Sequence, residues 1–249
     1  MYLSCLLINV GDNPDRPRPG RLWLRNLYRV HQRLCMAFPS DSRTQDDPLF
    51  LKPHVPGDFS HVHAPRTSDQ AFLFRLDPES GGRVVILVQS ATEPKWEYAF
   101  QNAQHLLAAP PDTKAFAAEF KPGQLLRFRL EANPTKRLRK DSQNERGEPI
   151  GEKWIGKRVP VPVSKLEDWL ARRAERNGFG LREVMSAQPG YIYVNKEAKA
   201  GTGHRLCVVR YEGLLEVVDP QTFREKAIIR GIGPAKGFGF GLLSVAPVR

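Results

Sequence analysis

Tyr28 and His31 stand three residues apart in a segment, 26–38, whose apolar residues recur at the spacing of a helix. We expect this helix to begin after Asn26, whose side chain can cap it. The spacing places both side chains on one face of the helix, one turn apart. An imidazole gives or takes a proton near neutral pH, and a phenol orients or donates a hydrogen bond. The pair can therefore do acid–base chemistry without a metal ion, although His31 taken alone is more simply explained as a surface or packing residue.

Three other histidines, His54, His61 and His63, lie in one segment, 39–69, that is rich in Pro, Asp and Ser. A histidine pair separated by one residue can bind zinc or copper, but no cysteine or closely spaced fourth ligand completes the set. The three cysteines of the chain lie far apart, so neither a zinc finger nor a disulfide framework is indicated. We therefore predict no metal site and no cofactor.

The chain is strongly basic, with a formal net charge of +11 and a pI near 9.8. Residues 121–182 hold 16 Lys and Arg against 8 Asp and Glu, and so carry +8 of the +11. This concentration favours a polyanionic partner, although composition alone leaves a merely solvated basic surface open. We expect phosphate contacts from a ridge on a helix at 164–177 and from the loops before it: Lys136, Arg137, Arg139, Lys140, Lys157, Arg158, Lys165, Arg172 and Arg176.

A glycine-rich segment, RGIGPAKGFGFGLLSVAP, occupies residues 230–247. It is not a P-loop, because Lys236 precedes a glycine, and it is not a dinucleotide fingerprint, because it leaves a helix and enters a strand. Glycines at this spacing let backbone N–H groups approach a phosphodiester chain, with charge from Arg230 and Lys236. A tight loop packed against a sheet edge would explain them equally well. The glycines concerned are Gly231, Gly233, Gly237, Gly239 and Gly241.

The two halves of the chain show the same order of expected elements. In the first half we expect strands at 2–9, 71–76 and 83–90 and helices at 26–38 and 96–107. In the second half we expect strands at 124–132, 191–195, 205–211, 214–218 and 242–245, a helix at 164–177 with a Ser164–Glu167 capping box and a stop at Gly178, and a helix from Asp219 to Arg230.

Adjacent strands joined by short turns favour antiparallel hairpins over a doubly wound parallel sheet. We therefore predict an α+β fold of two tandem ferredoxin-like (βαββαβ) domains with antiparallel sheets. We place the domain with the Tyr28–His31 helix at residues 1–112 and the domain with the basic surface and the glycine-rich segment at residues 113–249.

Hydrophobic residues make up 41% of the 249, enough for a folded core. No apolar stretch approaches the roughly 20 residues that a membrane helix needs. The first residues lack the basic leader and the cleavage site of a signal peptide and are better explained as a first strand. We therefore expect a cytoplasmic protein without membrane contact.

The glycine-rich segment, at the end of a chain with this pattern, resembles the glycine-rich loop of the repeat-associated RNA-binding superfamily of CRISPR proteins, and above all that of its CasE (Cse3) branch. Five further motifs follow in the order of that branch. They are NLYRVHQRL (26–34), LVQSATEPKW (87–96), KPGQLLRFRLEANPTKR (121–137), GKRVPV (156–161) and YEGLLEVVDP (211–220). The resemblance covers nearly the whole chain apart from residues 39–70.

The resemblance implies a metal-independent endoribonuclease that cleaves CRISPR repeat transcripts at the 3′ base of their stem-loop. In such enzymes the 2′-OH attacks the adjacent phosphate, which gives a 2′,3′-cyclic phosphate and a 5′-OH. His31 falls on the family's catalytic histidine, and Tyr28 falls on the tyrosine that assists it. The resemblance also implies that the protein stays bound to the mature crRNA hairpin, beside other subunits of a type I-E Cascade complex.

Two other functions stay open at this point. A non-catalytic subunit of the same superfamily would bind the RNA hairpin and need not keep Tyr28 and His31. A general basic RNA- or DNA-binding protein would lose its ligand to an unrelated hairpin in competition. The segments 39–70 and 141–153 look longer than a minimal family member requires, and either could contact a neighbouring subunit.

Overall fold

The computed structural model describes residues 1–11, 19–39, 72–78, 83–143, 147–194 and 203–248. His54, His61 and His63, together with most of the loop predicted at 39–69, lie outside the described residues.

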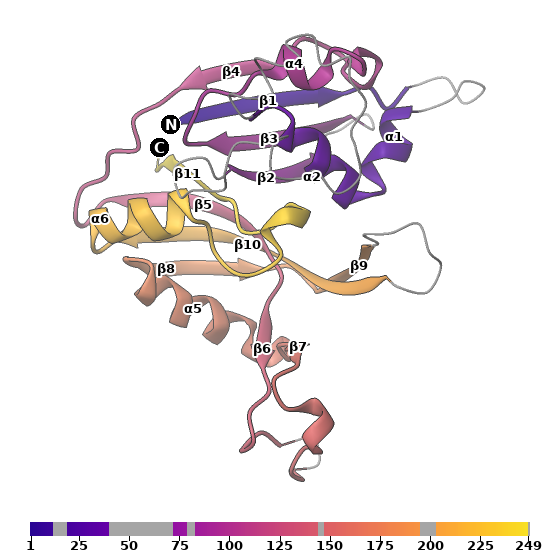
Figure 1. Ribbon diagram of the computed structural model, residues 1–249. Helices are drawn as coiled ribbons and strands as arrows, with labels where there is room; N and C mark the ends of the chain where they lie inside the picture. The colour runs from indigo at the N-terminus through magenta and orange to yellow at the C-terminus, as the bar shows by residue number, and fades with distance from the viewer. Residues whose placement is uncertain (12–18, 40–71, 79–82, 144–146, 195–202, 249) are drawn as a thin grey trace.

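In the described residues, the first half of the chain forms a four-stranded antiparallel sheet that is accompanied by helices (Figure 1). Its elements are β1 (Tyr2–Ile8), α1 (Pro19–Leu24), α2 (Leu27–Cys35), β2 (Phe72–Pro78), β3 (Val84–Ser90), α4 (Trp96–Phe100), a 3₁₀ turn at Gln104–Leu106 and β4 (Asp112–Ala115). The strand order is β2-β3-β1-β4, with every neighbouring pair antiparallel.

The second half forms another antiparallel sheet, with strand order β11-β5-β10-β8 and with β9 paired to the first part of β10. Its strands are β5 (Leu125–Ala132), β6 (Thr135–Arg137), β7 (Arg158–Pro160), β8 (Phe179–Ser186), β9 (Gly190–Val194), β10 (His204–Val217) and β11 (Leu243–Pro247). Its helices are 3₁₀ turns at Glu152–Trp154 and Val163–Lys165, α5 (Leu166–Arg176), α6 (Pro220–Thr222) with a π-helix at Phe223–Ile229, and a 3₁₀ turn at Lys236–Phe238.

The two sheets share one topology. In each, the first and third strands of the unit lie at the centre, the fourth flanks the first, and the second flanks the third. This is the order of a ferredoxin-like unit, and it confirms the predicted α+β fold with antiparallel sheets. Figure 1 shows one sheet above the other, with α5 below the second sheet and the β6–β7 hairpin projecting beyond it.

The first half differs from the prediction at its helices. α2 ends at Cys35, but the chain continues in tighter turns, in which Ala37 N–H donates to the Leu34 carbonyl and Phe38 N–H to that of Cys35. The helix predicted at 96–107 is only α4 followed by a 3₁₀ turn. α1 and β4 were not predicted, since both are short and contain or adjoin prolines that are typical of loops.

The second half departs from the prediction at several places, one of them the β6–β7 hairpin, where only loops were expected. The prediction of a capping box at Ser164 is wrong, because a 3₁₀ turn precedes α5 and the helix begins after Lys165 without a side-chain cap. The strands predicted at 205–211 and 214–218 are the single strand β10. Gly213 lies inside this strand, and glycine is needed there because a β-carbon would collide with the carbonyl of Glu183. β8 was not predicted, whereas Gly178 does end the preceding segment with a φ of +78°.

Each sheet has its own hydrophobic core. Val30 and Leu34 of α2 pack with Phe74 and Trp96 in the first core, and all four are buried. The second core joins residues of α5, β5, β10 and the π-helix. The predicted division at 112/113 falls within β4, which pairs with β1, so a boundary that keeps the first sheet whole lies after Ala115.

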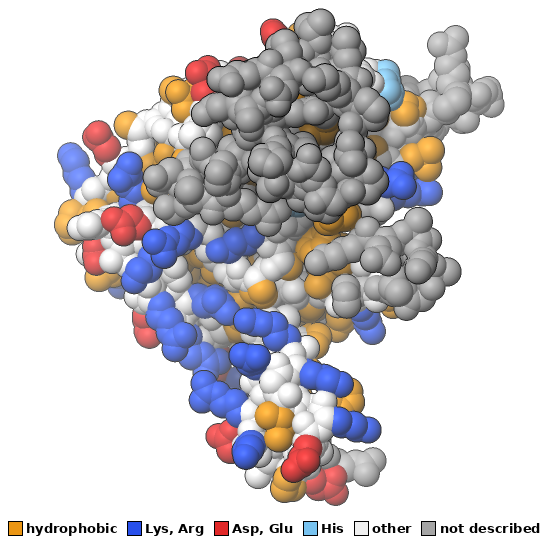
Figure 2. All heavy atoms as spheres, in the orientation of Figure 1, with side chains coloured by type: hydrophobic (Ala, Val, Ile, Leu, Met, Phe, Trp, Pro, Cys, Tyr) orange, Lys and Arg blue, Asp and Glu red, His pale blue; other side chains and the backbone are white. Residues whose placement is uncertain are grey.

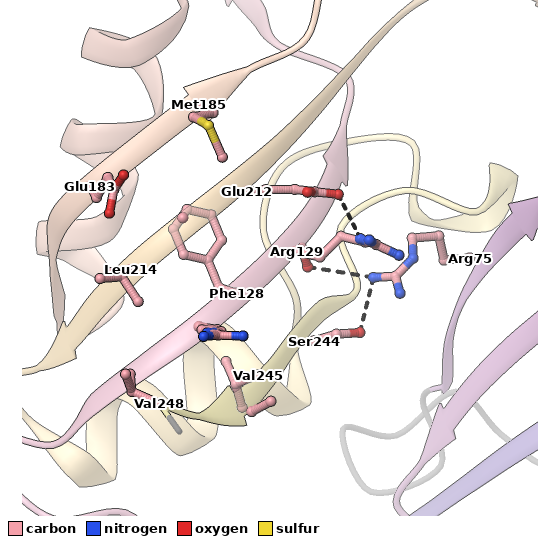
Figure 3. A pocket seen from close by; sticks show the side chains of 13 residues that line it. Arg75, Phe128, Arg129, Glu183, Met185, Glu212, Leu214, Ser244, Val245 and Val248 are labelled. Carbon is pink, nitrogen blue, oxygen red and sulfur yellow. Dashed lines mark hydrogen bonds and ion pairs between the residues drawn. The ribbon is translucent and has the colours of Figure 1, made fainter.

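The buried side chain of Arg75 in β2 links the two units (Figure 3). Its guanidinium binds both carboxylate oxygens of Asp77 at 2.8 Å and donates to Ser244 Oγ of β11 at 2.9 Å. A cavity of about 610 Å³ opens beside this contact, where Arg129 and Glu212 pair with each other at 2.7 Å. None of the sequence-predicted site residues lines this cavity.

We expect Arg75→Met to lower the free energy of unfolding by about 3 kcal/mol, because it leaves Asp77 without its cation and removes the link to Ser244. Denaturant unfolding followed by circular dichroism measures this difference. The exposed Arg83 serves as the control, and Arg83→Met should change stability by at most about 0.5 kcal/mol. Equal stability of the two variants would contradict a role for Arg75 between the units.

Candidate active site and nucleic-acid interface

Helix α2 holds the predicted pair. The Asn26 side chain accepts hydrogen bonds from the backbone N–H groups of Tyr28 and Arg29 at 3.1 and 3.2 Å, as the predicted cap requires. Val30 is fully buried and fixes the rotation of the helix, so that Tyr28 and His31 lie half-buried beside the apolar face. The sequence therefore placed both side chains correctly on the helix.

The imidazole of His31 lies in a fixed orientation. It stacks on Phe72 and Phe74 of β2, with ring centroids 5.5 and 6.2 Å away. The Sγ atom of Cys35, one turn along α2, lies 3.6 Å from Nε2. Two aromatic neighbours and a thiol contact restrict the ring, which is the preorganisation that proton transfer to a bound substrate needs.

Gly237 of the glycine-rich segment lies against the same imidazole. A β-carbon added at Gly237 would stand 3.6 Å from His31 Nε2 and 3.7 Å from Cδ2. The backbone of the second unit thus lies beside the histidine of the first, although 206 positions separate the two residues in the chain (237 less 31). Because Gly237 has no side chain, this residue places only backbone against that edge of the ring.

The other glycines let the segment pass close to its neighbours. β-carbons would stand 2.7 Å from Leu73 at Gly231 and 3.1 Å from Phe74 at Gly239, both at positive φ. Gly233 faces the edge of Trp169 in α5, where a β-carbon would stand at 3.3 Å. Packing therefore accounts for these three glycines, whereas Gly237 adjoins the histidine.

Cations gather where this segment meets α5. Burial lowers the pKa of Lys236, and the charges of Arg173 and Arg230 lower it further. Burial also lowers the pKa of Arg173, and so do the charges of Arg158 and Arg176. Arg173 was not among the predicted site residues, because it lies between the exposed ridge and the buried face of α5. The adjacent Arg172–Arg173 pair is its only signal in the sequence.

The predicted phosphate-contacting residues lie on the surface of the second unit. Lys165 forms an exposed ion pair with Asp168 at 3.3 Å, and Arg137 Nε donates to the carbonyl of Gly156 at 3.0 Å. Figure 2 shows Lys and Arg side chains over α5 and along the β6–β7 hairpin. Lys236 is half-buried, and the exposed members are Lys136, Arg137, Arg139, Lys140, Lys157, Arg158, Lys165, Arg172, Arg176 and Arg230.

The described residues hold neither a metal-binding cluster nor a membrane-spanning helix. No group of three or more His, Cys, Asp or Glu side chains in this part of the chain is arranged to hold a metal ion. Within the same residues, no helix has the length and apolar character needed to cross a membrane.

Similarity to known proteins shows which family the chain belongs to. The family model described as CRISPR associated protein matches residues 1–247. The CRISPR-associated endoribonuclease Cse3 of Thermus thermophilus is 40% identical, over 99% of this chain and 100% of its own length. The chain belongs to the CasE (Cse3) family of CRISPR-associated proteins.

Two further relatives of this CasE-family protein agree. The CRISPR system Cascade subunit CasE of Escherichia coli is 29% identical over 100% of both chains. A solved structure of CRISPR endoribonuclease Cse3 bound to a 19-nucleotide RNA matches with a TM-score of 0.70 and 33% identity, over 99% of this chain and 100% of the other. The family inferred from the motifs is therefore confirmed.

We expect Gly237→Ala in the CasE-family protein to slow cleavage of an RNA substrate about tenfold or more, because the added methyl group covers the edge of His31 that carries Nε2. The contact is of ordinary van der Waals length, so the melting temperature should stay nearly unchanged. Single-turnover cleavage and thermal unfolding measure the two effects.

Gly151→Ala is the matched control, since its added β-carbon would meet no described atom beyond its chain neighbours within 4 Å and its φ of −66° suits alanine. A Gly237→Ala protein that cleaves as fast as the wild type would show that the reacting phosphate does not lie beside this edge of the imidazole.

Proposed function

We propose that the chain is an endoribonuclease that cleaves CRISPR repeat transcripts at the 3′ base of the repeat stem-loop. The observation that carries the proposal is the contact between His31 and Gly237, which sets an oriented imidazole beside a cationic backbone segment. The relative named an endoribonuclease supports it, and so does the related structure with bound RNA.

In the proposed reaction, the 2′-OH attacks the adjacent phosphorus and loses its proton. The bond from phosphorus to the 5′-oxygen breaks, and that oxygen gains a proton, so that a 2′,3′-cyclic phosphate and a 5′-OH result. His31 serves in proton transfer, and Tyr28, one turn away, orients a reacting oxygen or donates a hydrogen bond to it. Lys236 and the glycine-rich backbone oppose the negative charge that develops on the phosphate.

The proposed reaction uses no metal ion and no cofactor, because proton transfer and charge stabilisation both come from side chains and backbone of this chain. EDTA should therefore leave the cleavage rate unchanged. Dependence of the rate on an added divalent ion would contradict this part of the proposal.

The basic surface of the second unit supports retention of the hairpin. Double-stranded RNA offers mainly its shape and its phosphates to a protein, because its major groove is deep and narrow. The exposed cations along α5 and the β6–β7 hairpin suit such contacts. We further propose that the chain keeps its product hairpin as a subunit of a type I-E Cascade complex in the cytoplasm. The related CasE, whose name describes it as a Cascade subunit, supports the assembly into such a complex.

We also propose that proton transfer and phosphate binding belong to different domains. The first domain, ending after β4, carries the proton-transfer pair, and the second carries the phosphate contacts and the glycine-rich segment. Cleavage would then need both domains, because neither alone holds the histidine and the cations together.

The alternative is a subunit that binds the hairpin without cutting it. Such a subunit has no use for an imidazole oriented beside a glycine. The contact of His31 with Gly237 therefore favours the enzyme.

We expect His31→Ala to slow cleavage of a labelled repeat RNA about 10²- to 10⁴-fold, as loss of a proton-transfer group does. Binding of the uncleaved hairpin should remain within about twofold, since the basic surface is intact. A 2′-deoxy substitution at the scissile nucleotide should stop cleavage by the wild type. Denaturing gels and a binding titration measure these effects.

His105→Ala is the control, because His105 is exposed and lies outside the proposed site. Full activity of His31→Ala, or cleavage of the 2′-deoxy substrate, would overturn the mechanism. Binding without cleavage by the wild type would support the non-catalytic alternative.

A further inference from the structure

Arg173 of α5 lies where this helix packs against the glycine-rich segment. Its guanidinium carbon stands 4.4 Å from the centre of the Trp169 ring. Trp169 is buried, stacks on Tyr211 with ring centroids 6.2 Å apart, and faces Gly233 at its edge. The aromatic ring therefore holds Arg173 beside the segment that contacts His31.

The charge of Arg173 is uncompensated within the described residues. The structure records no ion pair between Arg173 and a carboxylate in this part of the chain, and its Nε atom is buried without a hydrogen-bond partner. The charged groups that act on its pKa most strongly after burial are two further cations, Arg158 and Arg176. Lys236 adds a further positive charge, since Arg173 lowers its pKa.

The half-buried charge of Arg173, which is unpaired within the described residues, lowers the stability of the folded protein when no RNA is bound. A half-buried guanidinium loses hydration and is repelled by its neighbours, so the folded state is less stable than one with a neutral side chain there. A phosphate group would remove both penalties, because it neutralises the charge and accepts hydrogen bonds from the planar guanidinium.

We propose that Arg173 and Lys236 together form a phosphate-binding site for the backbone of bound RNA, with Trp169 as the platform that orients Arg173. The site rests on the proposed function and adds to it a residue outside the exposed basic ridge. Arg173 is a binding residue here, and Trp169 is a positioning residue.

The test compares Arg173→Met with the parent protein in a His31→Ala background, which keeps the RNA uncleaved. We measure the dissociation constant of the repeat hairpin at several salt concentrations, together with the melting temperature of the free protein. Methionine keeps the aliphatic packing on Trp169 but removes the charge. Arg224→Met on the π-helix is the control, since Arg224 is exposed and belongs to no proposed site.

We expect Arg173→Met to weaken RNA binding about tenfold, as the loss of a charged hydrogen bond does, and to lower the slope of log affinity against log salt by about one. The melting temperature of the free protein should stay equal or rise, because the repulsion among the cations is relieved. Arg173→Lys should restore the salt slope but only part of the affinity, because lysine lacks the planar group that stacks on Trp169.

Three results would overturn the site. Unchanged affinity and salt slope in Arg173→Met would show that no phosphate is bound there. Lost affinity together with a melting temperature lower by more than about 5 °C would show that Arg173 merely supports the fold, since a binding role predicts no such loss. Failure of the parent protein to bind the hairpin would overturn the proposed function itself, which separates the two failures.

Discussion

The close passage of one backbone segment between two sheets is the constraint on which the structure depends. Residues 231–241 come so near to Leu73 and Phe74 that a side chain larger than hydrogen would collide at Gly231 and crowd Phe74 at Gly239. Hydrogen bonds fix the path, from Ile232 N–H to the carbonyl of Gly241 and from Gly241 N–H to that of Glu131 in β5. Glycine costs conformational entropy on folding, and the segment bears that cost at Gly231 and Gly241 because only glycine fits there.

The same passage brings together the residues of the proposed site. His31 comes from a helix of the first unit, and Gly237 and Lys236 come from the last segment of the second. Each unit can bury its own core, but neither brings an imidazole and a cationic backbone together. The position of the site thus follows from how the units pack, which Arg75 also helps to fix from the far side of β2.

The cations of the second unit differ in how much they cost the stability of the free protein. The exposed cations on α5 and the β6–β7 hairpin cost little, because water screens them. Arg173 and Lys236 are half-buried, so their mutual repulsion weighs on the free protein. Proteins commonly give up stability in this way where function needs a charge, and a polyanion compensates the loss on binding.

Local signals allowed the sequence to predict much of this. The cap at Asn26 and the helical spacing of apolar residues predicted α2 and the face that carries Tyr28 and His31. Hairpin signals predicted the antiparallel sheets, but short elements such as α1 and β4 depend on tertiary contacts and left no periodic pattern. The contact of His31 with Gly237 and the role of Arg173 depend on the packing of distant segments, which spacing along the chain cannot report.

The most direct test of the account is a crystal structure of the His31→Ala protein with an uncleaved repeat hairpin that carries a 2′-deoxy scissile nucleotide. We predict that the scissile phosphate lies beside residue 31 and Gly237, within hydrogen-bonding distance of Lys236 or the glycine-rich backbone. A scissile phosphate bound elsewhere, for example in the cavity beside Arg75 and Arg129, would contradict the account.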